Sequence, residues 1–380
     1  GSDIAGYKLY YGNYTGYSFS NSIDVGNVTE YTLDLPINYR DSTIAVTAYD
    51  TDVDGLNDLT DGNESWYSIA EPVITFYLAD NGVTITCSEA SIGETGIING
   101  VEYTKRSKDQ ITTENASTTC TSGITDMIAL FESDTTFNSN INHWDVSSVE
   151  SMRYMFAYAT NFNQLLNDWD VSKVSDMEGM FDRAANFNNP VNDWDVSNVT
   201  NMNGLFSHAL SFNQPLNNWD VSRVTNMDAM FYVASSFNHD INEWDVSNVE
   251  GMNHMFADAK TFDQPLSDWN VSSVKTMNSM FVNTPFNQDI SRWNLKSNLT
   301  TDAMFRFNTK FNQDISSWNV SSVESMVVMF HGATSFNQPI GIWNVSSVTN
   351  MNRMFEGATA FNQDLKSWCT SSIESIPENF

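Results

Sequence analysis

Large apolar residues return along most of the chain at a fixed spacing, with polar residues between them. Tryptophan recurs every 25 residues, with one step of 24, at positions 144, 169, 194, 219, 244, 269, 293, 318, 343 and 368. Phenylalanine keeps the same spacing in two columns that begin at Phe131 and Phe137, and the short step lies between Phe281 and Phe286. A fixed period of this length is the signature of a repeat architecture.

The repeating unit is W-[DN]-V-S-x-V-x-x-M-x-x-M-F-x-x-A-x-x-F-N-Q-x-[IL]-x-x. A unit of this size cannot enclose a core alone, so neighbouring units must cover one another's apolar side chains. We therefore predict a repeat solenoid of about ten 25-residue coils over residues 119–380, with Trp, Phe and Met columns inside.

Each coil has three predicted parts. The segment F-N-Q-x-[IL] has the length and pattern of a short strand, which would pair in parallel with the next coil. The spacings of three and four in M-x-x-M-F-x-x-A favour one or two helical or 3₁₀ turns. The segment W-[DN]-V-S is predicted to be a turn whose Asp or Asn accepts a hydrogen bond from a backbone N–H two or three residues later.

These columns resemble the BspA-like surface-protein family, whose members carry the leucine-rich-repeat-like DUF285 unit. The resemblance covers roughly residues 73–380, and residues 73–118 resemble the family's β-rich N-terminal cap. Degraded units at residues 119–131 and 368–380 agree with capped ends. The resemblance implies an exported, non-catalytic display scaffold located outside the cell or at its surface.

Residues 1–72 lack the repeat and alternate polar and apolar residues between turns, which predicts antiparallel strands of a β-sandwich. Their order resembles a fibronectin type III domain, with residues 7–11 as a central strand and residues 43–49 as the next-to-last. The first two strands of such a domain are missing. We expect the sandwich to be truncated, or completed by another segment or by another chain.

An acidic loop, "DTDVDGLNDLTD" at residues 50–61, follows these strands. Oxygen ligands at alternating positions, with Gly55 at the bend, are typical of a Ca²⁺ loop. The alternative is a solvated acidic loop without a metal ion. The predicted ligands are Asp50, Asp52, Asp54, the Leu56 carbonyl, Asp58 and Asp61.

The charge of the chain narrows the possible partners. With 47 acidic and 17 basic residues, the net charge is −30. This charge disfavours nucleic acid and anionic membrane surfaces, and the sequence has no apolar run of about 18 residues for direct membrane insertion. A basic protein, a neutral glycan or divalent cations remain acceptable.

The chain has three cysteines, so a single disulfide would leave one thiol over. Cys87 and Cys120 bracket the expected cap, and we predict that they form a disulfide that ties the cap to the first coil. Cys369 would then be a free thiol. We expect it to be a small buried side chain rather than a reactive or intermolecular one.

The sequence offers little for catalysis. The five His residues occupy unrelated repeat positions, and paired carboxylates such as Asp168 and Asp170 recur along the repeats, whereas a glycosidase needs one pair in a cleft. We therefore expect no enzyme activity.

Two polar columns allow two interpretations each. The Asn column of F-N-Q is either an amide ladder that satisfies backbone groups or a glycan-binding row. An acidic column after Trp is either a self-capping turn or a surface for cations or a basic partner. Its members are Asp145, Asp170, Asp195, Asp220 and Asp245.

The leading functional hypothesis is a cell-surface adhesion or recognition module that binds a host or neighbouring-cell protein or polysaccharide. The alternative is a structural spacer or assembly subunit of an extracellular protein or filament, with self-association by strand exchange through the incomplete sandwich. Specificity requires residues that break the repeat. The candidate ligand-face residues are Arg153, Tyr154, Tyr158, Arg183, His208, Tyr232 and His254, followed by Arg306 and His331.

Overall fold

The computed structural model describes residues 6–12, 21–28, 43–49, 68–70, 75–295, 297 and 300–373. The chain divides into two compact units, Gly1–Thr75 and Phe76–Phe380. Among the described residues, no helix is long and apolar enough to cross a membrane.

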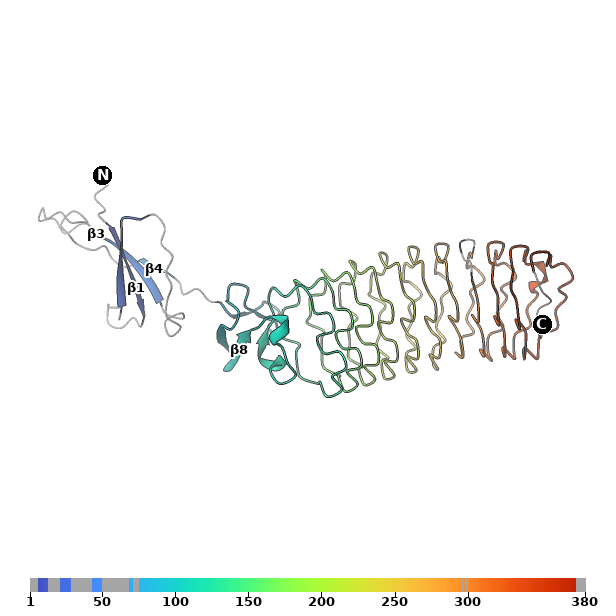
Figure 1. Cartoon of the computed structure of the whole chain (residues 1–380), viewed down its shortest axis with the longest axis horizontal. Coiled ribbons are helices and arrows are strands. Elements are labelled where there is room, and N and C mark those ends of the chain that lie inside the picture. The colour runs from blue at the N-terminus through green and yellow to red at the C-terminus, as the bar shows by residue number, and fades with distance from the viewer. Residues whose placement is uncertain are drawn as a thin grey trace, which may run out of the picture. The chain divides into compact units, whose positions relative to one another are not determined.

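The N-terminal unit contains one described antiparallel sheet (Figure 1). Its strand order is β2-β1-β3-β4. Its strands are β1 (Gly6–Gly12), β2 (Asn21–Gly26), β3 (Thr43–Tyr49) and β4 (Ser68–Ala70). The strands predicted at residues 7–11 and 43–49 are present, and β1 lies inside the sheet. The described ranges contain no second sheet, so the sandwich stays a prediction.

A small β-rich region opens the second unit. Strands β5 (Tyr77–Leu78) and β6 (Ile85–Thr86) pair antiparallel, whereas β7 (Thr95–Ile98), β8 (Val101–Lys105) and β9 (Thr119–Cys120) form a separate sheet. Two 3₁₀ helices, η2 (Lys108–Gln110) and η3 (Ala116–Thr118), lie between β8 and β9. Ile85 forms a parallel bridge with Trp144, which connects this region to the first full repeat.

The repeats then follow one another as stacked coils (Figure 1). One parallel β-bridge joins each coil to the next, at the residue before the first Met, as between Ser151 and Asp176. The Trp169 and Trp194 rings are 6.4 Å apart and 4° from parallel. Within one coil the Phe156 ring stacks 4.0 Å from its neighbour Phe162. The apolar columns therefore form one continuous buried core.

Each buried Trp also connects two coils through its indole N–H. Trp169 Nε1 donates to the Ile141 carbonyl at 3.1 Å, and Trp368 Nε1 donates to the Ile340 carbonyl at 3.1 Å. A buried indole N–H needs such a partner. Each buried Trp therefore stabilises the stack of coils both by ring packing and by a hydrogen bond to the preceding coil.

The strand predicted at F-N-Q-x-[IL] is wrong, because these segments have no strand in the described coils. The backbone N–H of Asn163 donates to Asn138 Oδ1 at 2.9 Å, and so it is not available to a backbone carbonyl of the neighbouring coil. A side chain thus replaces the backbone ladder that the strand prediction assumed. The Asn column is the predicted amide ladder.

The M-x-x-M-F segment forms successive turns, and the helical prediction fails for a backbone reason. The N–H of Met155 bonds within its coil to Met152 at 3.1 Å, whereas the N–H of Tyr154 bonds to Glu178 of the next coil at 2.8 Å. Tyr154 and Tyr158 have positive φ values of 54° and 61°. Left-handed residues interrupt a right-handed helix after each turn.

The shortened repeat is completed by a buried polar side chain that the sequence analysis missed. Asn308 is fully buried. Its Nδ2 donates to the Phe286 carbonyl at 2.9 Å, and its Oδ1 accepts the N–H of Phe311 at 3.0 Å. Asn308 therefore satisfies backbone groups around the 24-residue step.

Candidate functional site

The predicted ligand-face residues fall on one part of the coil, at the two positions after the first Met and the two positions after the following Phe. We call this surface the display face. Five members have positive φ, with values of 53–61°: Tyr154, Tyr158, Arg183, His208 and His254.

A left-handed conformation costs a residue with a side chain about 1 kcal/mol or more. Glycine avoids this cost, and it occupies the equivalent positions 179, 204, 332 and 357. Large side chains are thus held on the display face where glycine would be less strained.

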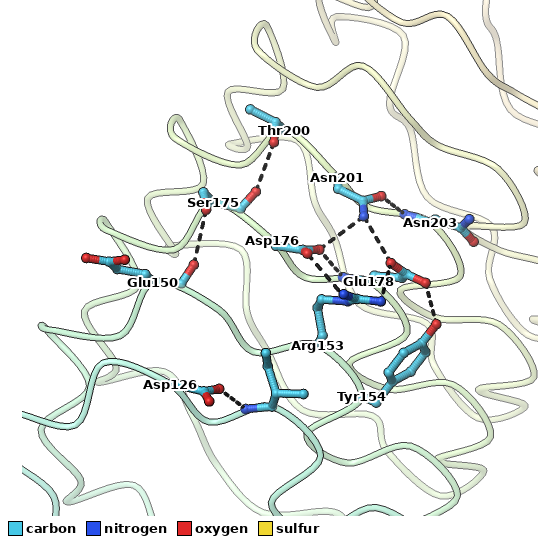
Figure 2. A network of polar contacts seen from close by, with 11 residues as sticks. Asp126, Glu150, Arg153, Tyr154, Ser175, Asp176, Glu178, Thr200, Asn201 and Asn203 are labelled. Carbon is cyan, nitrogen blue, oxygen red and sulfur yellow. Dashed lines mark hydrogen bonds and ion pairs between the residues drawn. The ribbon is translucent and has the colours of Figure 1, made fainter.

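One polar network on the display face links three coils (Figure 2). Arg153 Nη2 lies 3.1 Å from Glu178 Oε2, and Arg153 Nε lies 3.5 Å from Asp176 Oδ2. The Tyr154 hydroxyl donates to Glu178, and this bond raises the pKa of Tyr154. Asn201 Nδ2 donates to Asp176 at 3.1 Å and to Glu178 at 3.2 Å. Each charged group in the network is therefore held by two or more partners.

Aromatic and cationic side chains continue along the display face. The Arg183 guanidinium lies over the Tyr158 ring at 5.2 Å. His208 contacts Tyr232 edge-on at 4.9 Å, and Tyr232 contacts His254 at 5.9 Å. The first seven of the nine predicted ligand-face residues, from Arg153 to His254, therefore each have a side-chain contact to another residue of the face, and Tyr158 is still 44% exposed.

His208 is held in its neutral form. Burial, followed by the positive charge of Arg183, lowers the pKa of His208. Asp182 lies 3.7 Å from His208 Nδ1 and acts in the opposite direction. At neutral pH this position therefore presents an uncharged imidazole.

A second group lies further along the display face. Arg306 stacks on Phe307 at 4.7 Å, and Phe307 contacts His331 edge-on at 5.0 Å. His331 and Arg353 both reach Glu356, at 3.1 Å and 3.0 Å. Phe307 and Arg353 were not predicted. Phe307 occupies the same repeat position as Tyr158, and Arg353 occupies the same position as Tyr154. A comparison of these repeat positions would have identified both residues.

The acidic column has the turn hydrogen bond that the sequence predicts. The N–H groups of Ser172 and Ser222 donate to Asp170 and Asp220 at 3.1 Å and 3.0 Å. The hydroxyl and backbone bonds from Ser222 lower the pKa of Asp220. The same backbone bond occurs at Asp145, Asp195 and Asp245.

The described residues contain no group of three or more His, Cys, Asp or Glu that could hold a metal ion. The predicted Ca²⁺ loop at residues 50–61, with its ligands Asp50, Asp52, Asp54, Leu56, Asp58 and Asp61, lies outside the described residues.

A disulfide joins Cys87 and Cys120, whose Cα atoms are 6.4 Å apart. Cys369 is exposed, so its expected burial is wrong. It occupies the turn position that is exposed as Asn319 and Asn344 in the two preceding coils. Hydrogen bonding to Ser371 lowers the pKa of the Cys369 thiol.

Comparison with known protein families assigns most of the chain to one family. The family described as "Mycoplasma protein of unknown function, DUF285" matches residues 102–219, 205–307 and 282–380. The chain belongs to this family and is a repeat protein across these residues. No curated protein and no solved structure matches it.

Proposed function

We propose that the protein is a non-catalytic adhesion or recognition module at the cell surface, built on a repeat solenoid, and that the display face binds a protein or polysaccharide of a host or neighbouring cell. The observation that carries this proposal is the gathering of the pattern-breaking side chains on one face of adjacent coils. The disulfide favours an oxidising, extracellular location.

The composition of the display face favours a protein as its partner. Tyr and Arg are enriched among residues that dominate protein interfaces. On this face these side chains are ordered by contacts with neighbouring residues. Arg153 forms an ion pair with Glu178, and the Tyr158 ring lies under the Arg183 guanidinium. Side chains that are already ordered lose less conformational entropy when a partner binds.

Binding to an array of extracellular-matrix proteins and surface glycans tests this proposal. We expect at least one array member to bind the native chain, and roughly tenfold weaker binding by the double variant Tyr158→Gly/His208→Gly, because two central contacts are removed. Both positions have positive φ, so glycine removes the side chain without backbone strain. Ser279→Gly, at another positive-φ position of the display face, is the control. An array without binders, or equal binding by the double variant, would contradict the proposal.

A second candidate, the spacer or assembly subunit, draws on the N-terminal sheet. Strands β2 and β4 are the outer strands of the described order β2-β1-β3-β4. A strand at the edge of a sheet can pair with a strand of another copy, and the sequence leads us to expect a sandwich without its first two strands. Light scattering over a range of concentrations tests this idea, and a strictly monomeric particle would exclude it.

We also propose that the loop at residues 50–61 binds Ca²⁺ as a structural ion. A Ca²⁺ titration followed by thermal melting should raise the unfolding temperature of the native chain, because an ion that binds the folded state stabilises it. Asp52→Asn/Asp54→Asn should abolish the increase. Equal melting with and without Ca²⁺ would refute the site.

A further inference from the structure

A second surface of the same coils keeps its pattern. We call it the amide stripe, and it consists of the two positions after Phe in F-N-Q. Its asparagines at the first of these positions are Asn138, Asn163, Asn188, Asn213, Asn238, Asn287, Asn312, Asn337 and Asn362, and Asn189 is its one asparagine at the second position. Its glutamines are Gln164, Gln214, Gln264, Gln288, Gln313, Gln338 and Gln363.

The amide groups of the stripe have a fixed orientation. Asn188 Oδ1 accepts the backbone N–H of Asn213 at 2.9 Å and Gln214 Nε2 at 3.0 Å. Asn213 Oδ1 accepts the backbone N–H of Asn238 at 3.1 Å in the same way. A backbone N–H can pair only with the amide oxygen, so the two ends of each Asn amide are assigned by chemistry.

This orientation leaves a row of unused donors. Among the described residues, none of the nine asparagines at the first stripe position uses its Nδ2 in a hydrogen bond, although the side chains are exposed or half-buried. Asn189, at the second position, differs, because its Nδ2 donates to Asn163 Oδ1 at 2.7 Å. Polar groups that a fold leaves outward at regular intervals, one per coil, are available to a ligand with the same periodicity. Because the Oδ1 bonds already order these amides, binding would cost little further entropy.

The charge of the stripe selects the kind of ligand. The chain carries a net charge of −30, yet Asp263 is the single charged residue at the twenty positions that follow Phe in the ten F-N-Q segments. An anionic polymer would be repelled by the rest of the molecule. A neutral polymer with many hydroxyl groups meets no such repulsion and complements amide donors and acceptors.

We infer that the amide stripe binds a neutral polysaccharide that lies along the stack of coils. Sugar hydroxyls accept from the Asn Nδ2 atoms and donate to the Gln Oε1 atoms. Each contact is weak, but contacts repeated on successive coils act together. The inference goes beyond the proposed function, because it gives the same coils a second ligand, a neutral polysaccharide, on a surface separate from the display face.

Native gel electrophoresis through soluble polysaccharides tests the stripe. The neutral probes are a mannan, a mixed-linkage β-glucan and an arabinoxylan, and polygalacturonate is the anionic probe. We expect at least one neutral probe to retard the native chain, and polygalacturonate to leave its mobility unchanged. Retardation by no neutral probe, or equal retardation by polygalacturonate, would overturn the inference and leave the stripe as an internal ladder only.

The substitution that tests the stripe, Asn to Asp, already occurs once in the sequence, at Asp263. Asp263 keeps the ladder, since its Oδ1 accepts the N–H of Asn287 at 2.8 Å and Gln288 Nε2 at 3.0 Å. The triple variant Asn188→Asp/Asn213→Asp/Asn238→Asp should therefore stay folded but lose three donors. We expect its apparent affinity for the polysaccharide to fall at least about tenfold. The reverse change, Asp263→Asn, should raise it by a factor of about five.

A matched charge control is available in the column that directly follows Trp, which is acidic in the earlier coils. Asn270→Asp/Asn319→Asp/Asn344→Asp adds the same three charges at positions where earlier coils carry Asp. Its retardation should equal that of the native chain, and a loss as large as that of the stripe variant would refute specific recognition. The display-face variant Tyr158→Gly/His208→Gly should also keep its retardation, so failure of the proposed function and failure of this inference give different results.

Discussion

The display face and the amide stripe belong to the same coils, but one varies from coil to coil and the other repeats. On the display face the connection between coils is made by the backbone, as in the bond from the Tyr158 N–H to Asp182 at 2.7 Å. On the stripe it is made by a side chain, as in the bond from the Asn213 N–H to Asn188 Oδ1 at 2.9 Å. Positions whose side chain satisfies the backbone are fixed, and positions whose backbone satisfies itself can vary.

The Trp column should show the largest effect of breaking a repeated position. Trp219→Ala removes a buried ring and its 2.9 Å bond to the Val191 carbonyl, so we expect a loss of about 3–5 kcal/mol in the free energy of unfolding. Denaturant titration measures it. Tyr232→Ala on the display face is the control, with an expected loss of less than about 1.5 kcal/mol. Equal losses would contradict the expectation that a repeated buried position contributes more to stability than a variable position of the display face.

Asn308 offers the same comparison at the shortened repeat. Asn308→Ala leaves the Phe286 carbonyl and the Phe311 N–H without their partner, and we expect a loss of about 2–3 kcal/mol by denaturant titration. The exposed Asn248 donates from its Nδ2 to the Ser222 carbonyl at 2.7 Å. Asn248→Ala should therefore cost less than about 1 kcal/mol. A cost for Asn308→Ala as small as that would contradict the role assigned to Asn308.

A valine pair on the display face sharpens the account of left-handed positions. Val233 has a φ of 58°, whereas Val282, one position earlier in its repeat, is not among the positive-φ residues. Val233→Gly should raise the free energy of unfolding by about 1 kcal/mol, because it relieves backbone strain. Val282→Gly should lower it by about 1 kcal/mol. Changes of the same sign would refute the strain argument.

The smallest expected effect is the change in stability with pH that His143 causes in the first coil. Burial lowers the pKa of His143, whose Nε2 lies 3.0 Å from the Thr119 carbonyl oxygen. The unfolded chain therefore binds a proton at higher pH than the folded chain. The contribution of the neutral imidazole is complete above about pH 6.5 and is lost as the pH falls. Melting between pH 7.5 and pH 5 should show this decline in the native chain and less of it in His143→Gln. Identical pH profiles would contradict the prediction.

Much of the repeat was predictable because it depends on side-chain chemistry that the sequence displays. The Trp and Phe columns, the Asp turn and the Asn ladder follow directly from residue types at a fixed period. The positions of the β-bridges could not be predicted in this way, because the Asn138 side chain accepts the backbone N–H that a strand would need for pairing. The helical prediction overlooked two columns of left-handed residues. Gly179, Gly204, Gly332 and Gly357 mark those columns in the sequence.

The remaining misses have similar causes. Asn308 replaces the usual Ala one coil after the deletion, and its buried amide donates to the carbonyl of Phe286, the residue that follows the deletion. Contacts along the display face, such as that between His208 and Tyr232, join positions that differ from coil to coil, so no periodic pattern reports them.

The most direct test of the account compares the free energies of unfolding of Asn188→Ala and His208→Gly. Loss of the Asn188 oxygen strands the Asn213 N–H, and we expect a cost of about 1–2 kcal/mol. Loss of the His208 side chain leaves its backbone bond to the Tyr232 carbonyl in place and relieves a φ of 53°, so the stability should be equal to or above that of the native chain. A larger loss for His208→Gly than for Asn188→Ala would contradict the claim that the backbone holds the display face and side chains hold the stripe.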